Sequence, residues 1–456
     1  MANGLIEGIP HSITSYNEKD IGALLNGNIY NVMAYGATGT GIDDDTAAIQ
    51  AAFDAAITAG YPITTARYAK GIVYFPVGTY RITKPIEVTG VIGLHVMGES
   101  QWMTIIAPSG TQDSAFDLNG LAYCTFERFS VVPASGAAVD KGIYLYWGGT
   151  GETIRTTFLN SFRNVNVAIG FGGSFRAGFS IGSNNNSLQC DGTSFYDCHV
   201  EGSWTTGNTT TYQAAFELGP PAGTTGNYNV NHCFYNCGSL TVRYFIHAEK
   251  VNYHVYGAEL EQGEVCFKGA TWQNTSIYDI SVEQFERFMV SINPTNLVQQ
   301  LTVSGVVFRA DNVNADGIWM DIKENGCINL TDLKAYWVTA TVPLIVRIDT
   351  NTGLYVTIEG LQQTTPYATG LVITSPSLTG VSIRGYVEIN TDQEIVALTS
   401  VTLPQTIMGA TGGSIGFYGT TPGAKPTITG SKGANAALTS LLSALATLGL
   451  VTDSTS

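Results

Sequence analysis

The chain has 456 residues, of which only 12% are charged, and its formal net charge is −15 at pH 7. An acidic protein of this kind would be repelled by nucleic acid and by anionic membranes, so neither is expected as a partner. No apolar run approaches the roughly 20 residues of a membrane span. The first residues, Met1 to Gly4, lack the basic and apolar regions of a secretory signal, so we expect synthesis in a host cytoplasm without a signal peptide.

Seven cysteines are present, an odd number, and none of their spacings suits a metal site. Cys198 and Cys237 occupy positions where a thiol serves as a small apolar side chain. We therefore expect reduced, structural cysteines, no bound metal and no other cofactor.

Residues 1–30 are predicted to form a short N-terminal arm. After it, Asp44, Asp45 and Thr46 supply a cap and a negative first turn for a helix. Apolar residues, including Ile49 and Phe53, follow at helical spacing and predict a helix over about residues 46–59. Residues 71–82 then read as a strand, a Pro-Gly bend and a second strand.

The stretch from Tyr35 to Ile82 resembles the N-terminal signature of the pectate-lyase-like superfamily, in particular its bacteriophage tailspike and tail-fibre polysaccharide depolymerases. The resemblance implies an all-β fold, a single-stranded right-handed parallel β-helix whose open first turn is capped by the helix. It carries no catalytic residue with it.

A six-residue sequence pattern, called the phrase here, recurs along the chain and indicates a fold built of successive coils. It reads Phe-Tyr-Asp-Cys-His-Val from Phe195, and returns from residues 234, 255 and 277, with a weaker copy from 301. The last four copies start 21, 22 and 24 residues apart (255 − 234, 277 − 255, 301 − 277), a period typical of one strand phrase per turn of a solenoid. Further copies start at residues 126, 162, 328 and 378. We therefore predict one β-helix over residues 31–404.

Apolar or small residues at offsets 0, +3 and +5 of the phrase predict an inward side, so offsets +4 and +6 should face solvent. Offset +6 gives Val132, Ala168, Glu201, Leu240, Glu261, Glu283, Val307 and Lys334. Parallel neighbours lie about 4.8 Å apart, which would place Glu261 beside Glu283. Such a pair suits the acid and the nucleophile of a retaining glycosidase. Glu261 and Glu283 are the first catalytic candidates, with Glu201 and Glu259 in reserve.

Offset +1 holds Tyr196, Tyr235, Tyr256 and Tyr278, a ladder suited to sugar rings and hydroxyls. His199, Arg243 and Arg287 are near enough in sequence to orient a substrate. The alternative is that the acids only solvate the surface and that the tyrosines pack at a turn or a subunit contact.

Residues 405–456 form a Gly/Thr-rich segment followed by a helix. Leu438, Leu441, Leu445 and Leu448 are spaced as a two-heptad seam with an uncharged opposite face. Such a short helix is marginal alone, so we expect it to hold a homotrimer together, with packing onto its own solenoid as the alternative. The tail resembles the C-terminal segments of phage tail proteins, and the N-terminal arm would attach to the phage tail or baseplate.

The sequence favours a tailspike depolymerase of the virion that hydrolyses a bacterial surface polysaccharide, capsule or exopolysaccharide, with a carboxylate pair. One alternative is a lyase that abstracts a proton next to a uronic acid with a Lys, Arg, His or Tyr base. Another is a receptor-binding spike without catalysis. The superfamily moves its active sites between proteins of the same shape, so the fold alone does not place the site.

Overall fold

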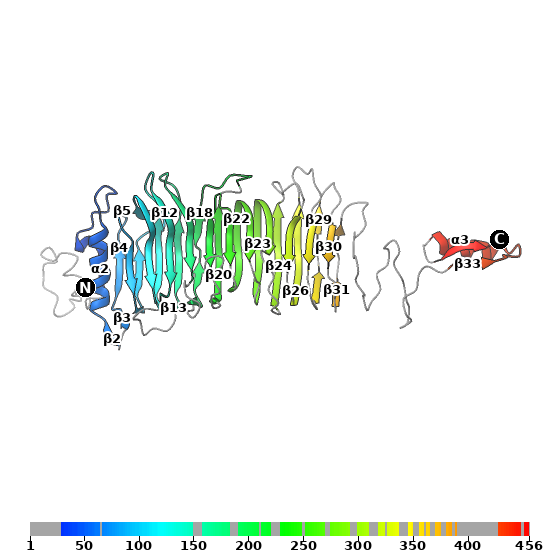
Figure 1. The fold of residues 1–456 in the computed structure, drawn as a ribbon, viewed down its shortest axis with the longest axis horizontal. Coiled ribbons are helices and arrows are strands. Elements are labelled where there is room, and N and C mark those ends of the chain that lie inside the picture. The colour runs from blue at the N-terminus through cyan, green and yellow to red at the C-terminus, as the bar shows by residue number, and fades with distance from the viewer. Residues whose placement is uncertain are drawn as a thin grey trace, which may run out of the picture.

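The computed structural model describes a long coil of parallel strands (Figure 1). It describes residues 29–63, 66–148, 157–182, 190–208, 211–219, 229–248, 251–269, 274–291, 299–309, 318–323, 326–336, 345–349, 355–359, 362–364, 370–374, 380–384, 388–389, 427–447 and 451–455. The predicted N-terminal arm and the predicted end of the coil, near residue 404, lie outside these residues. Within them no helix is long and apolar enough to cross a membrane.

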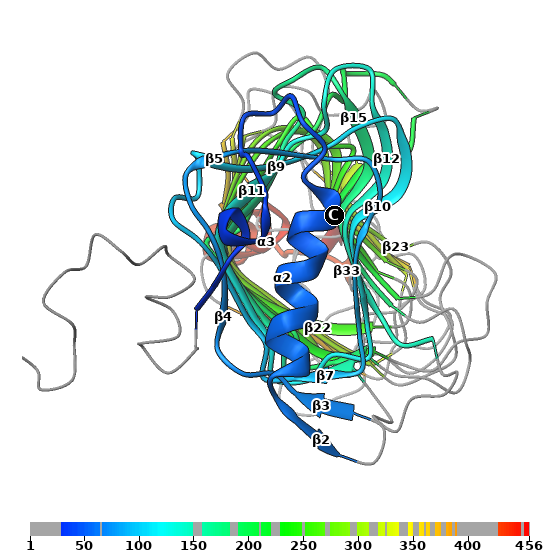
Figure 2. The same ribbon diagram turned by 90° about the vertical axis from the view of Figure 1, so that its left-hand side faces the viewer.

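The coil is a right-handed parallel β-helix, as predicted, and its strands line three faces that we call A, B and C (Figure 2). Face A contains β1 (Ile29–Asn31), β4 (Ile72–Phe75), β8 (His95–Gly98), β17 (Ser194–Tyr196), β28 (Tyr355–Glu359) and β31 (Gly380–Arg384). Face B contains β5 (Gly78–Ile82), β9 (Thr104–Pro108), β18 (His199–Glu201), β29 (Gln362–Thr364) and β32 (Glu388–Ile389).

Face C contains β6 (Ile86–Thr89), β10 (Thr111–Asn119), β12 (Ala138–Tyr146), β15 (Ser174–Ile181), β19 (Ala214–Leu218), β21 (Tyr244–Ala248), β25 (Ile318–Lys323), β27 (Ile345–Asp349) and β30 (Gly370–Thr374). Longer strands run through a corner and belong to two or three faces: β11 (Thr125–Val131), β14 (Ser161–Val167), β20 (Asn229–Leu240), β22 (Val251–Gly269), β23 (Thr275–Ser291), β24 (Gln299–Arg309) and β26 (Gly326–Tyr336). Short strands at the corner between faces C and A are β2 (Tyr61–Ile63), β3 (Ala66–Tyr68), β7 (Val91–Ile92), β13 (Thr157–Phe158) and β16 (Cys190–Asp191).

The corner between faces A and B is made by a single residue at offset +2 of the repeated phrase. In eight successive turns this residue has φ between 50° and 73°: Arg128, Asn164, Asp197, Asn236, Gly257, Asp279, Gly305 and Asp332. Gly, Asn and Asp tolerate the left-handed region better than other residues. The prediction that the phrase is one straight strand is therefore wrong, because offsets 0 and +1 lie on face A and offsets +3 to +6 lie on face B.

The core is a double file of phenylalanine rings. Phe126, Phe162, Phe195 and Phe234 stack at centroid distances of 5.2, 5.4 and 4.8 Å. Phe179 and Phe216, from face C, stack at 5.0 Å and meet Phe195 edge-on at 5.3 and 5.1 Å. The inward slots predicted from the phrase are buried, which confirms the assignment of the core: Phe126, Phe162, Phe195, Phe234, Leu260, Ile280 and Val282.

The first turn is closed by α2 (Thr46–Thr58), which lies across the end of the coil (Figure 2). The helix buries Ile49, Ala52, Phe53 and Ala56 against the core. Asp44 accepts a hydrogen bond from the Thr46 amide at 3.1 Å, whereas Asp45 accepts from the amides of Thr38 and Gly39 at 2.6 and 3.2 Å. The acids thus hold the turn before the helix; the short 3-10 helix η2 (Val32–Tyr35) precedes them.

The register of the weak copy is corrected by the strand pairing. Ile277 pairs with Val303, not with Leu301, and Glu283 pairs with Arg309. Offset +6 of this turn is therefore Arg309 instead of Val307, which places a cation beside Glu283. The predicted starts at residues 328 and 378 are wrong as well: Val303 pairs with Leu330, so offset +6 of that turn is Tyr336 instead of Lys334, and the last copy starts at Ile383.

The C-terminal part that the structure describes contains β33 (Thr427–Gly430), α3 (Ala436–Thr447) and β34 (Thr452–Thr455), and β33 pairs with β34 in parallel. Leu438 and Leu441 are 37% and 55% exposed, whereas Leu442 is buried. Leu448 lies outside the described residues, so the seam that the sequence predicts is only partly represented here.

Candidate functional site

The four tyrosines of the repeated phrase form a column on face A. Neighbouring rings stack at 4.8, 5.2 and 5.6 Å for Tyr196–Tyr235, Tyr235–Tyr256 and Tyr256–Tyr278. The Arg163 guanidinium lies 4.0 Å from the ring centre of Tyr196. Because the ring faces are occupied by each other, the column presents ring edges and hydroxyl groups to solvent. It suits hydrogen bonds to sugar hydroxyls better than stacking on sugar rings.

The predicted carboxylates lie on face B in the register that the phrase indicates. Glu261 pairs with Glu283 on adjacent strands, while Leu240 separates Glu201 from Glu261. Glu259 lies one turn beyond Gly238, which follows His199 in the +4 column. Arg309 Nη1 contacts Glu283 Oε2 at 3.5 Å. Glu261 and Glu283 are exposed, so the pair is open to a ligand but has an ion-pair partner that the sequence reading missed.

The remaining predicted residues do not join the tyrosines. His199 lies on face B with the glutamates, where burial lowers its pKa against the opposing effect of Glu201 and Glu259. Arg243 directly precedes β21 on face C, and Arg287 lies in the part of β23 that belongs to the same face. Arg243 is ion-paired through Nε with Glu264, and both side chains are largely buried. The predicted site is therefore spread over three faces: the tyrosines stack on face A, the glutamates and His199 share face B, and the two arginines belong to face C.

Face C carries a second repeated phrase, which the sequence reading overlooked. Residues 177–181, 214–218, 244–248 and 265–269 pair in register, each with an inward aromatic or aliphatic residue in the middle: Phe179, Phe216, Ile246 and Phe267. The next residue in each case points outward and is polar: Ser180, Glu217, His247 and Lys268. This alternation beside a constant apolar position is the signal that could have located the column.

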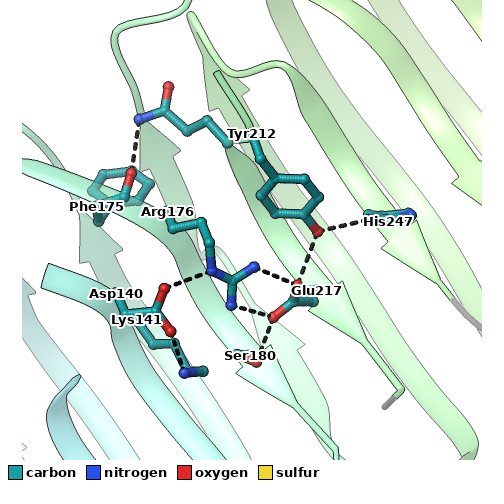
Figure 3. Close-up of polar contacts among 9 residues, drawn as sticks. Asp140, Lys141, Phe175, Arg176, Ser180, Tyr212, Glu217 and His247 are labelled. Carbon is teal, nitrogen blue, oxygen red and sulfur yellow. Dashed lines mark hydrogen bonds and ion pairs between the residues drawn. The ribbon is translucent and has the colours of Figure 1, made fainter. Parts of the chain in front are cut away.

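Three members of this outward column, Ser180, Glu217 and His247, belong to one hydrogen-bonded network (Figure 3). Arg176 on β15 donates to both oxygens of Glu217, at 2.6 and 2.9 Å, and through Nε to Asp140 at 2.6 Å. Ser180 donates to Glu217 Oε2 at 2.8 Å. The Tyr212 hydroxyl lies 2.9 Å from Glu217 Oε1 and 2.6 Å from His247 Nδ1.

Tyr212 is held over face C by the segment that precedes β19. Gln213 donates to the Phe175 carbonyl at 3.2 Å, and Gly207 donates to Glu286 at 3.2 Å. The Tyr212 ring packs edge-on against Tyr244 at 5.6 Å. Lys268 donates to the Tyr244 hydroxyl at 2.9 Å, beside the network and not hydrogen-bonded into it by any of these contacts.

The surroundings of the network shift the pKa values of its titratable side chains in different directions. Burial disfavours a charged Glu217, but hydrogen bonds from Arg176, Ser180 and Tyr212 outweigh it and lower the pKa of this carboxyl. Burial, aided by Lys268, lowers the pKa of His247 to about 4. Burial raises the pKa of the Tyr244 hydroxyl well above its ordinary value. A cluster of perturbed groups with specific charged partners is a mark of functional sites, although structural ion pairs produce it as well.

Nothing in this cluster resembles a metal centre. Among the residues that the structure describes, no group of three or more His, Cys, Asp or Glu side chains is placed to hold a metal ion. Arg176 occupies the space between the two nearest carboxylates, Asp140 and Glu217.

Comparisons with known proteins find similarities for the N-terminal part of the chain. Residues 29–126 match the family model described as rhamnogalacturonase A/epimerase, pectate lyase-like. Mannuronan C5-epimerase AlgE5 of Azotobacter vinelandii is 52% identical over 82 residues, which are 17% of this chain and 7% of that protein. The chain thus matches less than a tenth of the length of this relative. Residues 29–126 are a pectate-lyase-like segment.

Two solved structures are similar in shape. The A-module of mannuronan C-5 epimerase AlgE6 of Azotobacter vinelandii has 16% identity and a TM-score of 0.47, over 78% of this chain and 98% of that one. The pre-mature gene product 12 of bacteriophage phi29 has 16% identity and a TM-score of 0.40, over 80% and 54%.

Proposed function

We propose that the protein acts on an acidic bacterial polysaccharide, and that the chemistry takes place on face C. The observation that carries the proposal is the hydrogen-bonded network of Arg176, Glu217, Tyr212 and His247, with the cation of Lys268 close enough to His247 to influence its pKa. The 82-residue similarity to a mannuronan C5-epimerase, together with the rhamnogalacturonase A/epimerase family model that residues 29–126 match, supports the substrate class.

The reaction class that suits these residues begins with removal of the proton next to a uronate carboxylate. Lys268 would neutralise the carboxylate, and His247 would accept the proton through Nε2, which is buried in the free protein and would have to be uncovered by a shift of the side chains around it. The negative charge of the sugar would raise the pKa of His247 from its low value in the free protein, because an adjacent anion favours the imidazolium. Return of a proton to the opposite side gives an epimer, whereas loss of the 4-linked oxygen, protonated as it leaves, gives an unsaturated uronate.

The test uses purified polyuronates and capsular polysaccharides with the full chain. Ultraviolet absorbance reports unsaturated ends, and proton NMR reports epimers. His247→Gln should lower the rate at least 100-fold, while His254→Gln, on face A, should leave it unchanged. Full activity in His247→Gln, or no change in any acidic polysaccharide with the wild type, would exclude this chemistry.

Hydrolysis by Glu261 and Glu283 is the second candidate, favoured by their register on adjacent strands and their exposure on face B. Strand spacing of about 4.8 Å is near the 5–5.5 Å that retaining enzymes require. Glu201 and Glu259, with His199, are the reserve residues on the same face. Tyr196, Tyr235, Tyr256 and Tyr278 would hold sugar hydroxyls on face A, around the corner from the glutamates.

Release of reducing ends without ultraviolet absorbance separates this reaction from the first. Glu261→Gln and Glu283→Gln should each reduce that release at least 100-fold. Glu359→Gln, an exposed glutamate on face A, is the matched control. Normal release by both variants would remove the pair from consideration. Binding of polysaccharide without any product would favour a receptor-binding spike.

The setting that we propose is a phage virion acting at the host cell surface, as a homotrimer attached to the tail or baseplate through residues 1–30. Support comes from the resemblance of the C-terminal segment to phage tail proteins and from the exposed Leu438 and Leu441 on α3. Antibody labelling of phage particles would test the location.

A further inference from the structure

We infer that Tyr212 is a positioning residue that fixes which nitrogen of His247 carries the proton, and that Glu217 sets the direction of this relay. The assignment follows from the hydrogen bonds alone, and only its catalytic use rests on the function proposed above. The relay runs from β19 through the preceding segment to β21 (Figure 3).

The Glu217 carboxylate fixes the direction because it receives four donors. Two come from Arg176 at 2.6 and 2.9 Å, one from Ser180 at 2.8 Å and one from Tyr212 at 2.9 Å. An ionised carboxylate offers about four acceptor positions and has no proton to give. Its lowered pKa keeps it ionised at neutral pH. The proton between Glu217 and Tyr212 therefore belongs to the tyrosine.

Tyr212 has a single hydroxyl proton, and Glu217 uses it. The contact of 2.6 Å between the Tyr212 oxygen and His247 Nδ1 must then contain the imidazole's proton, donated from Nδ1 to the hydroxyl oxygen. The reverse arrangement would leave the phenol oxygen and the Glu217 oxygen facing each other at 2.9 Å without a hydrogen. His247 is thus protonated on Nδ1, and Nε2 carries the lone pair.

The groups around His247 keep the ring neutral. Tyr212 and Tyr244 both lie against it, each with a centroid distance of 5.4 Å, and their own centroids are 5.6 Å apart. Lys268, Arg176 and Arg243 disfavour a second proton, and Glu217 favours it. Burial adds to the effect of the three cations, so one proton remains at neutral pH and its place is decided by Tyr212.

The arrangement has the logic of a catalytic triad with a phenol inserted between carboxylate and imidazole. In both cases a carboxylate holds the imidazole in one tautomer, with the second proton site on Nε2. Tyr212 acts through His247 and needs no contact with substrate.

The test is NMR of the full chain with 15N-labelled histidine, without substrate, at pH 7. The chain has six histidines, and loss of one signal set in His247→Gln assigns the residue. We expect Nδ1 protonated and Nε2 with the far-downfield shift of a lone-pair nitrogen. Tyr212→Phe should move His247 toward protonation on Nε2. Tyr244→Phe is the matched control, because this ring lies equally close and its hydroxyl accepts from Lys268; the tautomer should not change.

Protonation of wild-type His247 on Nε2, or on both nitrogens at pH 7, would overturn the inference, as would an unchanged tautomer in Tyr212→Phe. If that variant does not fold, the wild-type spectrum still decides. A confirmed tautomer without activity on any acidic polysaccharide would reject the proposed function and leave the relay standing.

Discussion

Replacement of Phe195 by alanine tests the double file of rings that forms the core. Phe195 is 0% exposed and contacts four other rings, Phe162 and Phe234 along its own file and Phe179 and Phe216 across it. Loss of the transfer free energy of a buried phenylalanine accounts for about 1.5–3 kcal/mol. The strand ladders hold the neighbouring turns apart, so the cavity should collapse little and the total should be about 4–5 kcal/mol.

Tyr196→Ala is the control, since it removes a ring from the adjacent position on the outer side of the same strand. It loses one tyrosine stack and the contact with Arg163, for which about 1 kcal/mol is expected. Urea unfolding followed by circular dichroism, at fixed protein concentration, measures both. Hydrogen exchange should show the loss of protection centred on the turns that contain Phe162 and Phe234, because each turn contacts its neighbours. Equal destabilisation by the two variants would refute the assignment of the core.

Three further outcomes are expected. Asn236→Val should destabilise by about 1–2 kcal/mol because φ is 51° there, whereas Asn236→Gly should not; equal urea midpoints would contradict this. Burial lowers the pKa of His232 from 6.5 to about 4. The neutral ring's contribution to stability is therefore fully present above pH 6.5, and the unfolding free energy falls by about 1.4 kcal/mol for each unit that the pH is lowered from 6.5 to 4. His232→Gln should flatten the pH dependence of the unfolding free energy in that window, and an unchanged slope would count against this assignment. Removal of residues 435–456 should lower the mass measured by light scattering if α3 holds a trimer, and an intact chain that is already monomeric would reject the trimer.

The fold could be predicted from the repeat because the inward residues of neighbouring turns must stack on one another. Phe195 and Phe234 recur at one offset for that reason, and the helix at residues 46–58 followed from the spacing of its apolar residues. The predicted acidic first turn was wrong, and the side chain of Asp45, the N-cap residue, makes no capping hydrogen bond. The corner at offset +2 also has a sequence signature, because apart from Arg128 every residue at this offset is Asn, Asp or Gly. The interruption of the alternation at the bend, where offsets +1 and +2 are both outside the core, marks the same corner.

The network on face C could not be found from any one residue. Arg176, Tyr212 and His247 do not repeat, and they are separated by segments of different length, so only the strand register brings them together. The outward side chain of each turn does not pack in the core, so core packing does not determine which residue stands at that position. A search for the apolar middle of the second phrase, Phe179, Phe216, Ile246 and Phe267, would have aligned the column, but the hydrogen bonds among its members needed coordinates.

The three faces also determine how the coil would respond to force. Hydrogen bonds between neighbouring turns point along the long axis of the molecule, the direction in which parallel strands are spaced. Tension on the two ends therefore loads all three faces of each turn side by side and passes from turn to turn in series. Under such a load we expect turns to detach one at a time from an end, at similar forces, while the helix α2 protects the first turn by covering its edge.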